Sequence, residues 1–187
     1  MLEAIIARRR SVRHFSSGAI SQYQLSQLLW AAQGISNRRS KLRTIPSAGA
    51  SHPLEIFIVC GLNCVEDLAE GIYHYDANNH SLIRHYEGDV RPELAGAALN
   101  QSFINQAPVD IVICALYERT AMRYGDRGGR YVHMEVGHVG QNIYLQASAL
   151  GLGTVAIGAF NDEEVSQVLR LEEPLKPLYI MPVGKPA

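Results

Sequence analysis

The chain has 187 residues, about the size of one domain. Hydrophobic residues make up 47% and charged residues 19%, so a sizeable core can form, and disorder, collagen and coiled coil are excluded. Seventeen basic against eighteen acidic residues leave a formal charge of −1, which gives no general attraction for nucleic acid or an anionic membrane. We expect a single domain spanning residues 1–187.

Targeting signals and disulfides are not expected. The longest apolar candidate, residues 143–160, is interrupted by polar residues and glycines and does not predict a membrane span. The first residues carry their basic cluster after the apolar ones, which is the reverse of a secretory signal. Cys60, Cys64 and Cys114 are an odd number and lie in or beside apolar runs. We therefore expect reduced thiols and a cytoplasmic protein.

The first half of the chain contains both helix and strand signals. A short helix is predicted over residues 2–10, and a second follows the capping box of Ser21 and Gln24 and ends at Gly34. The elements predicted next are a loop over residues 36–53, a buried strand over 54–60, a hairpin of strands 72–76 and 81–85, and a helix from Pro92 to about Asn100.

The second half contains the longest helical pattern. Apolar residues spaced at threes and fours predict a central helix over residues 130–150, which Gly151 would end. The other predicted elements are strands over 109–116, 154–159 and 178–183 and a helix over 162–169 capped by Asp162. A hairpin combined with helix-linked strands favours an α+β fold with a mixed or antiparallel sheet packed by helices.

Two motifs suggest chemistry but lack their required context. Gly151 and Gly153 belong to a dinucleotide-like G-x-G-x-x-A pattern, but here the helix precedes the strand, so we interpret them as a turn. His133, Glu135 and His138 suggest a zinc deaminase or a di-iron bundle, but neither the cysteine pair nor a second Glu-x-x-His follows. We expect these polar residues to make local hydrogen bonds, and we expect no metal site.

A basic cluster near the N-terminus is a candidate anion site. Arg9, Arg10, Ser11 and Arg13 combine planar donors and a hydroxyl at a predicted helix-to-loop transition. A solvated surface is the alternative, because charged runs commonly serve only solubility.

Several stretches follow one another in an order typical of one enzyme family. They are Arg9-Arg10-Ser11-Val12-Arg13, Pro46-Ser47-Ala48-Gly49-Ala50-Ser51, Gln106-Ala107-Pro108-Val109, Gly137-His138 with Gln141-Asn142, Gly151-Leu152-Gly153-Thr154, and Met181-Pro182-Val183-Gly184-Lys185. By these stretches the chain resembles the FMN-dependent nitroreductase family nearly end to end. Pro46-Ser47-Ala48-Gly49, Gly71-Ile72-Tyr73-His74-Tyr75 and the Gly-His-x-x-Gln-Asn helix are most similar to the SagB-type dehydrogenase branch.

The resemblance implies a homodimer with FMN at the subunit interface. Arg9 and Lys185 would hold the phosphate, and Arg10 would assist or face solvent. Arg13 would lie near flavin N1 and the C2 carbonyl, where a cation stabilises the reduced ring. The backbone N–H of Gly158 would approach N5. The other implied cofactor-binding residues are Ser11 and Ile157 and, from the partner subunit, Pro46, Ser47, Ala48 and Ser51.

The implied reaction is hydride transfer from NAD(P)H to a quinone, nitroaromatic or similar acceptor by a ping-pong mechanism. Phe103 and Tyr124 are candidates to stack on planar substrates, or else simply pack in the core or at the dimer interface. Because the flavin carries out the redox step, no catalytic protein side chain is expected. The alternatives are a dehydrogenase of peptide azolines and a non-catalytic flavin-binding protein.

The central helix also suggests how two subunits would meet. Gly137 and Gly140 are small residues three apart on this helix, so we expect close packing against its counterpart in the dimer. The alternative is that they allow the helix to approach the protein's own sheet.

Overall fold

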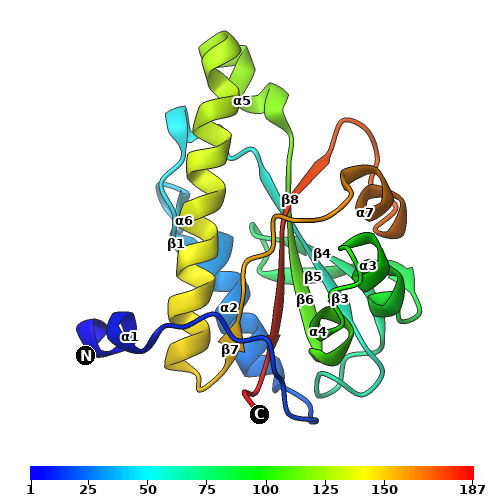
Figure 1. The fold of residues 1–187 in the computed structure, drawn as a ribbon. Coiled ribbons are helices and arrows are strands. Elements are labelled where there is room, and N and C mark those ends of the chain that lie inside the picture. Colours follow the sequence, from blue (N-terminus) through cyan, green and yellow to red (C-terminus); the bar gives the residue numbers. More distant parts are fainter.

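The computed structural model describes residues 1–187, which form one central sheet with helices on both faces (Figure 1). The sheet strands are β3 (Leu54–Cys60), β4 (Gly71–Asp76), β5 (Ser81–Glu87), β6 (Val109–Ala115), β7 (Gly153–Thr154) and β8 (Lys176–Gly184). The helices are α1 (Leu2–Arg8), α2 (Gln22–Gln33), α3 (Arg91–Ala97), α4 (Phe103–Gln106), α5 (Tyr117–Tyr124), α6 (Gly128–Ala149) and α7 (Asp162–Val168). None of them is both long and apolar enough to cross a membrane.

The sheet has the order β5-β4-β3-β6-β8-β7, and every neighbouring pair is antiparallel. Its centre is the pairing of β3 with β6, whose apolar runs are buried on both faces. Side chains alternate between the faces, so Ile56 and Ile58 join the core under α2 and α6, whereas Phe57 and Val59 join the core under α3, α4 and α7. The predicted α+β fold with a long central helix is confirmed.

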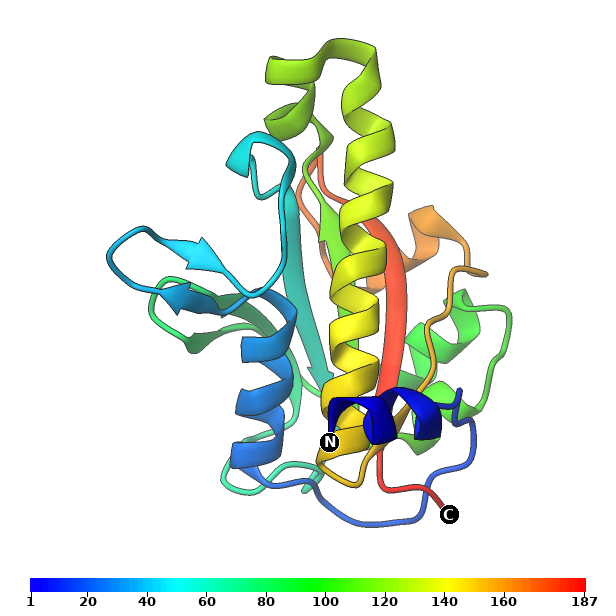
Figure 2. The ribbon, with the colours of Figure 1, turned by 90° about the vertical axis from the view of Figure 1, so that its left-hand side faces the viewer.

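The long helix α6 runs the height of the molecule on one face of the sheet (Figure 2). The helix ends at Ala149. Gly151, two residues later, has a φ of +72, a left-handed conformation that suits glycine. A Cβ at Gly140 would lie 3.5 Å from the ring of Tyr179 on β8, which is an ordinary van der Waals distance, so the approach of the helix to its own sheet does not require glycine there. A Cβ at Gly137 would meet nothing within 4 Å. Close packing of these two glycines against a second copy of the helix stays a prediction.

Most of the predicted local signals are present in the structure. Ser21 accepts from the Gln24 N–H at 3.1 Å and the Gln24 side chain accepts from the Ser21 N–H at 3.0 Å, which completes the capping box of α2. β4 and β5 form the expected hairpin, with a register shift between Ile72 and Tyr73. Helix α3 begins at Arg91 and has Pro92 in its first turn, as predicted.

Some predicted elements were wrong in extent or missing. The expected strand over 154–159 is only the two-residue β7, because Val155 and the residues after it leave the edge of β8, with one later bridge between Ile157 and Ile180. Asn161, not Asp162, caps α7, since its side chain accepts from the N–H groups of Glu163 and Glu164. The expected loop over 36–53 contains the small hairpin of β1 (Ile35–Asn37) and β2 (Leu42–Arg43) and the 3-10 turn η1 (Ala48–Ala50).

A buried carboxyl group lies in the middle of the sheet. Asp110 on β6 is fully buried, and neither carboxyl oxygen has a hydrogen-bond partner. Burial raises the pKa of Asp110 well above its ordinary value, although the nearby Arg91 opposes the shift. Arg91 is itself paired with Asp89 at 2.6 Å. The buried position of Asp110 therefore favours its neutral form.

We predict that the contribution of Asp110 to the free energy of unfolding falls as the pH rises from about 4, because the folded protein favours a proton on Asp110 that the unfolded chain releases near its ordinary pKa of about 3.9. The loss continues until the pH passes the raised pKa of the folded state. Asp110→Asn should flatten this decline in urea unfolding followed by circular dichroism. Asp67→Asn, at an exposed position, is the control and should leave the pH profile unchanged. An unaltered profile in Asp110→Asn would contradict the prediction.

Candidate functional site

The N-terminal basic segment lies along the edge of the sheet, next to the C-terminus. Ser11 bridges Thr154 of β7, and the Val12 N–H donates to the Thr154 carbonyl at 2.9 Å. Further along, the Ser16 N–H donates to the Lys185 carbonyl at 2.9 Å, and Phe15 bridges Pro186. A Cβ at Gly153 would lie 2.7 Å from the Val12 side chain, so only glycine permits this approach. The predicted phosphate-binding residues Arg9 and Lys185 thus come from two ends of the chain that lie together.

The hydroxyl of Tyr144 on α6 connects three segments at this place. It accepts from the Ala156 N–H at 2.8 Å and shares a hydrogen bond with the Ser11 hydroxyl at 2.9 Å. The guanidinium of Arg9 lies over the Tyr144 ring, 5.0 Å from its centroid. The orientation of Arg9 and Ser11 is therefore set by the long helix.

The cationic side chains of this cluster have no acidic partners. None of the ion pairs in the protein involves Arg9, Arg13 or Lys185. Arg10 differs, because its guanidinium donates to the carbonyls of Ala7 and Arg9 at 2.9 and 2.8 Å and so closes the end of α1. A set of unpaired cationic donors fits a dianionic phosphate well, because no carboxylate competes for them.

The segment after β7 presents a free backbone donor. Ile157 exchanges both backbone hydrogen bonds with Ile180 of β8, at 2.9 and 3.0 Å. Gly158 follows directly, is exposed, and its N–H donates to no backbone carbonyl. A Cβ at Gly158 would lie 3.7 Å from the ring of Tyr179, which fills the space behind it. Gly158, the residue expected to meet flavin N5, is thus positioned by the pairing of Ile157 with β8, and its own backbone N–H stays available to donate.

The loop over residues 46–52 is held in a strained conformation. Gly49, Ala50 and His52 have φ values of +58, +55 and +45. Residues other than glycine seldom adopt such values, so the strain lies at Ala50 and His52. The Ser47 hydroxyl accepts from the His52 N–H at 2.9 Å, which closes the turn. Ser51 shares a hydrogen bond with Thr120 of α5 at 2.8 Å.

Two arginines of α5 donate hydrogen bonds to backbone carbonyls of the same loop. Arg123 donates to the Gly49 carbonyl at 3.1 Å, and Arg119 donates to the His52 carbonyl at 2.9 Å. Arg119 also pairs with Glu55 of β3 at 2.6 Å, and Glu55 in turn contacts His74 at 2.8 Å. The loop is therefore tied through α5 to the centre of the sheet.

A buried carboxyl group supports the loop from below. Glu135 of α6 is 3% exposed, and its Oε1 has no hydrogen-bond partner. Burial raises the pKa of Glu135, and the nearby Ser47 hydroxyl and Ala48 N–H only partly oppose this. Burial also lowers the pKa of His52, assisted by Arg43 and Arg119.

Within one chain, the loop and the basic cluster lie at different levels of α6. The loop contacts the level of Glu135, whereas the cluster contacts Tyr144, which is about 14 Å further along the helix axis at 1.5 Å per residue. Figure 2 shows the same separation, with the loop in the upper half of the molecule and α1 across the lower end of α6. A single chain therefore does not bring Pro46, Ser47, Ala48 and Ser51 to the cluster.

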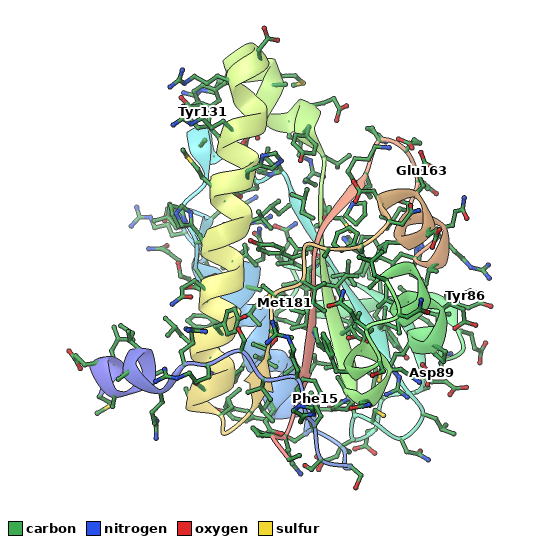
Figure 3. All side chains as sticks on the ribbon, in the orientation of Figure 1. Phe15, Tyr86, Asp89, Tyr131, Glu163 and Met181 are labelled. Atoms are coloured by element: carbon green, nitrogen blue, oxygen red, sulfur yellow. The ribbon has the colours of Figure 1, made fainter.

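The two aromatic residues predicted to line a substrate pocket are also apart. Phe103 lies on α4 near the lower end of the sheet in Figure 1, where it packs against the core under α3 and α7. Tyr124 ends α5 at the top of the molecule, with its ring 5.0 Å from that of Tyr131, which lies near the upper end of α6 (Figure 3). One chain places them at opposite ends, so they do not form one wall of a pocket within it.

The suggested metal motif is dispersed in the structure. His133 meets the Tyr117 hydroxyl at 2.6 Å, Glu135 faces the loop, and His138 is exposed. No group of three or more His, Cys, Asp or Glu side chains is arranged to hold a metal ion.

Some supporting residues carry no clear sequence signal. Tyr144 is one of many residues with polar groups in α6, and nothing in the neighbouring sequence indicates its contacts with Ser11 and Ala156. Arg119 and Arg123 do share a signal, because a spacing of four places both on one face of a helix.

Three known proteins of named function or family are similar to this chain in sequence. A Methanocaldococcus jannaschii protein named "putative nitroreductase" is 49% identical over 98% of this chain and 90% of its own length. The Microcin B17-processing protein McbC of Escherichia coli is 26% identical over 70% of this chain and 49% of its own length. An NADPH-flavin oxidoreductase of Vibrio harveyi is 31% identical over 57% of this chain and 48% of its own length.

Comparison with solved structures supports the same family. One solved structure is that of a Ralstonia eutropha protein, also named "putative nitroreductase". It matches with a TM-score of 0.85 at 26% identity, covering 100% of this chain and 83% of that chain. The model of the family described as "Nitroreductase family" matches residues 6–185, which include both the basic cluster and Lys185. The chain therefore belongs to the nitroreductase family.

Proposed function

We propose that the chain is an FMN-dependent oxidoreductase that uses NAD(P)H to reduce a quinone, nitroaromatic or similar small acceptor in alternating half-reactions. The observation that carries this proposal is the set of unpaired donors, Arg9, Arg13, Lys185 and the Gly158 N–H, in a nitroreductase fold. Bound FMN would supply the hydride chemistry. The flavin oxidoreductase among the relatives supports the same choice of cofactors.

The residues of the chain would divide the binding work between them. Arg9 and Lys185 would neutralise the phosphate, with Arg9 oriented by the Tyr144 ring. Arg13 would place a positive charge beside N1 and the C2 carbonyl, and the Gly158 N–H would donate to N5. Ser11 would lie beside these donors, and Arg10, whose guanidinium closes the end of α1, would assist or face solvent. No protein side chain needs to act as a nucleophile.

We further propose a homodimer whose partner contributes Pro46, Ser47, Ala48 and Ser51 to each site. Their separation from the basic cluster along α6 supports this arrangement. Apolar side chains exposed on α1, α2 and α6 also support it, because exposed apolar surface favours burial against a second copy. They are Leu2, Ile6, Trp30 and Met134, at 57, 53, 41 and 48% exposure.

A second candidate is a dehydrogenase of peptide azolines. It is favoured by the similarity to the processing protein McbC, although this chain spans only about half of that protein's length. A non-catalytic flavin-binding protein is a third outcome of the experiment below.

The purified protein is expected to be yellow, to bind FMN more tightly than FAD, and to lose its flavin absorbance when NAD(P)H is added without oxygen. FAD should bind less well because its adenosine extension would disturb the phosphate contacts of Arg9 and Lys185. Steady-state rates with varied acceptor should give parallel double-reciprocal lines. Reaction with an azoline peptide but not with NAD(P)H would favour the second candidate, and flavin binding without either reaction would favour the third.

Arg9→Ala and Arg13→Ala should have different effects. Removing Arg9 should weaken FMN binding about 10- to 100-fold, because a charge-assisted phosphate contact contributes ~1.5–3 kcal/mol. Removing Arg13 should lower the flavin reduction potential and slow reduction by NAD(P)H even in the FMN-saturated protein. Arg38→Ala, on the exposed turn between β1 and β2, is the control for loss of one positive charge. Equal potentials in Arg13→Ala and the parent protein would remove the assignment of Arg13.

Heterodimers test whether each site is shared between subunits. We combine one Arg13→Ala chain with one Ala48→Asp chain, carrying different affinity tags. If the loop comes from the partner, one site of the heterodimer carries both changes and the other carries none, so about half of the parent activity should return. If the loop belonged to the same chain, both sites would be damaged. Activity no higher than in the two variant homodimers would contradict the shared site.

A further inference from the structure

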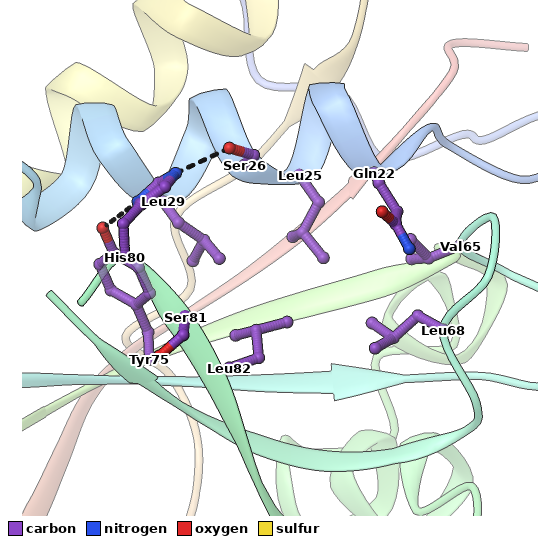
Figure 4. A pocket seen from close by; sticks show the side chains of 10 residues that line it. All are labelled: Gln22, Leu25, Ser26, Leu29, Val65, Leu68, Tyr75, His80, Ser81 and Leu82. Atoms are coloured by element: carbon purple, nitrogen blue, oxygen red, sulfur yellow. Dashed lines mark hydrogen bonds between the residues drawn. The ribbon is translucent and has the colours of Figure 1, made fainter.

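An apolar slot separates α2 from the hairpin of β4 and β5 (Figure 4). It has a volume of about 230 Å³ and lies between the buried Leu25 and Leu29 of α2 and Leu82 of β5. Val65 and Leu68 line the end beside Gln22. The slot is a half-open groove rather than an enclosed core void, and its buried apolar floor combined with a few polar groups at the rim is typical of a small-molecule site.

A chain of hydrogen bonds closes the other end of the slot. The imidazole of His80 uses both ring nitrogens, since Nδ1 meets the Tyr75 hydroxyl at 2.8 Å and Nε2 meets the Ser26 hydroxyl at 2.7 Å (Figure 4). His80 ends the turn between the two strands with φ +51, a conformation that costs free energy for a residue with a side chain. The imidazole is thus fixed between α2 and β4.

The three side chains of this hydrogen-bond chain carry one donor proton more than their two hydrogen bonds require. A neutral His80 has one N–H, and Ser26 and Tyr75 each have one O–H, so three protons serve two hydrogen bonds. Tyr75 is only 3% exposed, and a free phenolic proton in apolar surroundings would be costly, so its O–H donates to Nδ1. Nε2–H then donates to Ser26. The O–H of Ser26 is the donor that is left over, at the polar end of the slot.

The charge of the lining decides what such a donor can bind. The residues that line the slot include no Asp, Glu, Lys or Arg. A carboxylate or an ammonium group would lose its hydration without meeting an opposite charge. A neutral carbonyl or hydroxyl oxygen would instead accept one hydrogen bond from Ser26, while the leucines bury its hydrocarbon part.

We propose that the slot is a second ligand site, which binds an uncharged molecule with a compact hydrocarbon body and one carbonyl or hydroxyl oxygen directed at Ser26. Gln22, His80 and Ser81 are exposed, so the slot opens to solvent. Its lining shares no residue with Arg9, Arg13, Gly158 or Lys185, the donors of the proposed flavin site, so neither proposal depends on the other.

The arrangement favours binding over serine-type hydrolysis. In the tautomer derived above, Nε2 of His80 carries a proton and cannot accept the proton of Ser26. Ser26 lies inside α2, where the backbone N–H groups donate within the helix, so none is free to stabilise an oxyanion. The serine is a hydrogen-bond donor here.

Binding can be followed by methyl NMR of the flavin-loaded protein with labelled Leu and Val. Cyclohexanone should shift the methyl signals of Leu25, Leu29 and Leu82 with a Kd of about 1 mM, which is ordinary for a ligand of this size. Cyclohexanecarboxylate should bind at least about tenfold more weakly, because its charge is unmatched in the slot. No shifts at these methyl groups, or equal affinity for the carboxylate, would overturn the proposal.

Three variants identify the site. Ser26→Ala should weaken cyclohexanone binding about fivefold but leave binding of benzene, which has no oxygen, unchanged. Leu82→Phe should fill the slot and abolish binding of both molecules. Ile83→Phe is the matched control, because Ile83 is the next residue of β5, is 54% exposed and does not line the slot. Retained binding in Leu82→Phe, or equal weakening of both molecules by Ser26→Ala, would refute the assignment. FMN binding should stay intact in all three.

Discussion

The hydroxyl of Tyr144 is the contact on which the geometry of the basic cluster depends. It joins the long helix to Ser11 of the N-terminal segment and to Ala156 of the segment that carries Gly158. Because the Tyr144 ring also supports Arg9, one side chain fixes donors from two distant parts of the sequence. Tyr144 extends from the buried side of a helix packed on the sheet, so the stability of the core is transmitted to the exposed donors.

The second half of the proposed site uses a different source of rigidity. The loop over residues 46–52 contains two residues other than glycine with positive φ, Ala50 and His52, and contacts from α5 and α6 compensate for their strain. Glu135 stays buried beneath it at a cost to its charged form. A loop held in this way loses little further conformational entropy when a ligand arrives, which is the advantage of a preorganised site. The pairing of Arg119 with Glu55 extends this rigidity into β3.

Regular elements could be predicted from sequence because each carries its own local signal. The capping box of Ser21 and Gln24, the apolar run of β3 and the stop at Gly151 are contained within a few residues. The strand predicted from Thr154 could not be predicted in extent, since β8 continues beside it and only the path of the chain after Thr154 takes Val155 away from that edge. Likewise, the motif residues Arg9 and Arg13 could be found from resemblance, but the role of Tyr144 depends on contacts between residues far apart in sequence.

The bridge between Ser11 and Thr154 also has a consequence for solubility. The sheet has two edges, and the β7 edge is covered by the N-terminal segment, which pairs with it in parallel. The opposite strand, β5, is irregular beside its neighbour and carries Arg84 and Glu87, features that discourage another strand from adding to it. The arginine-bearing segment thus also protects the edge at β7. Its detachment would open a strand edge to self-association, so losses of the proposed anion site and of colloidal stability would occur together.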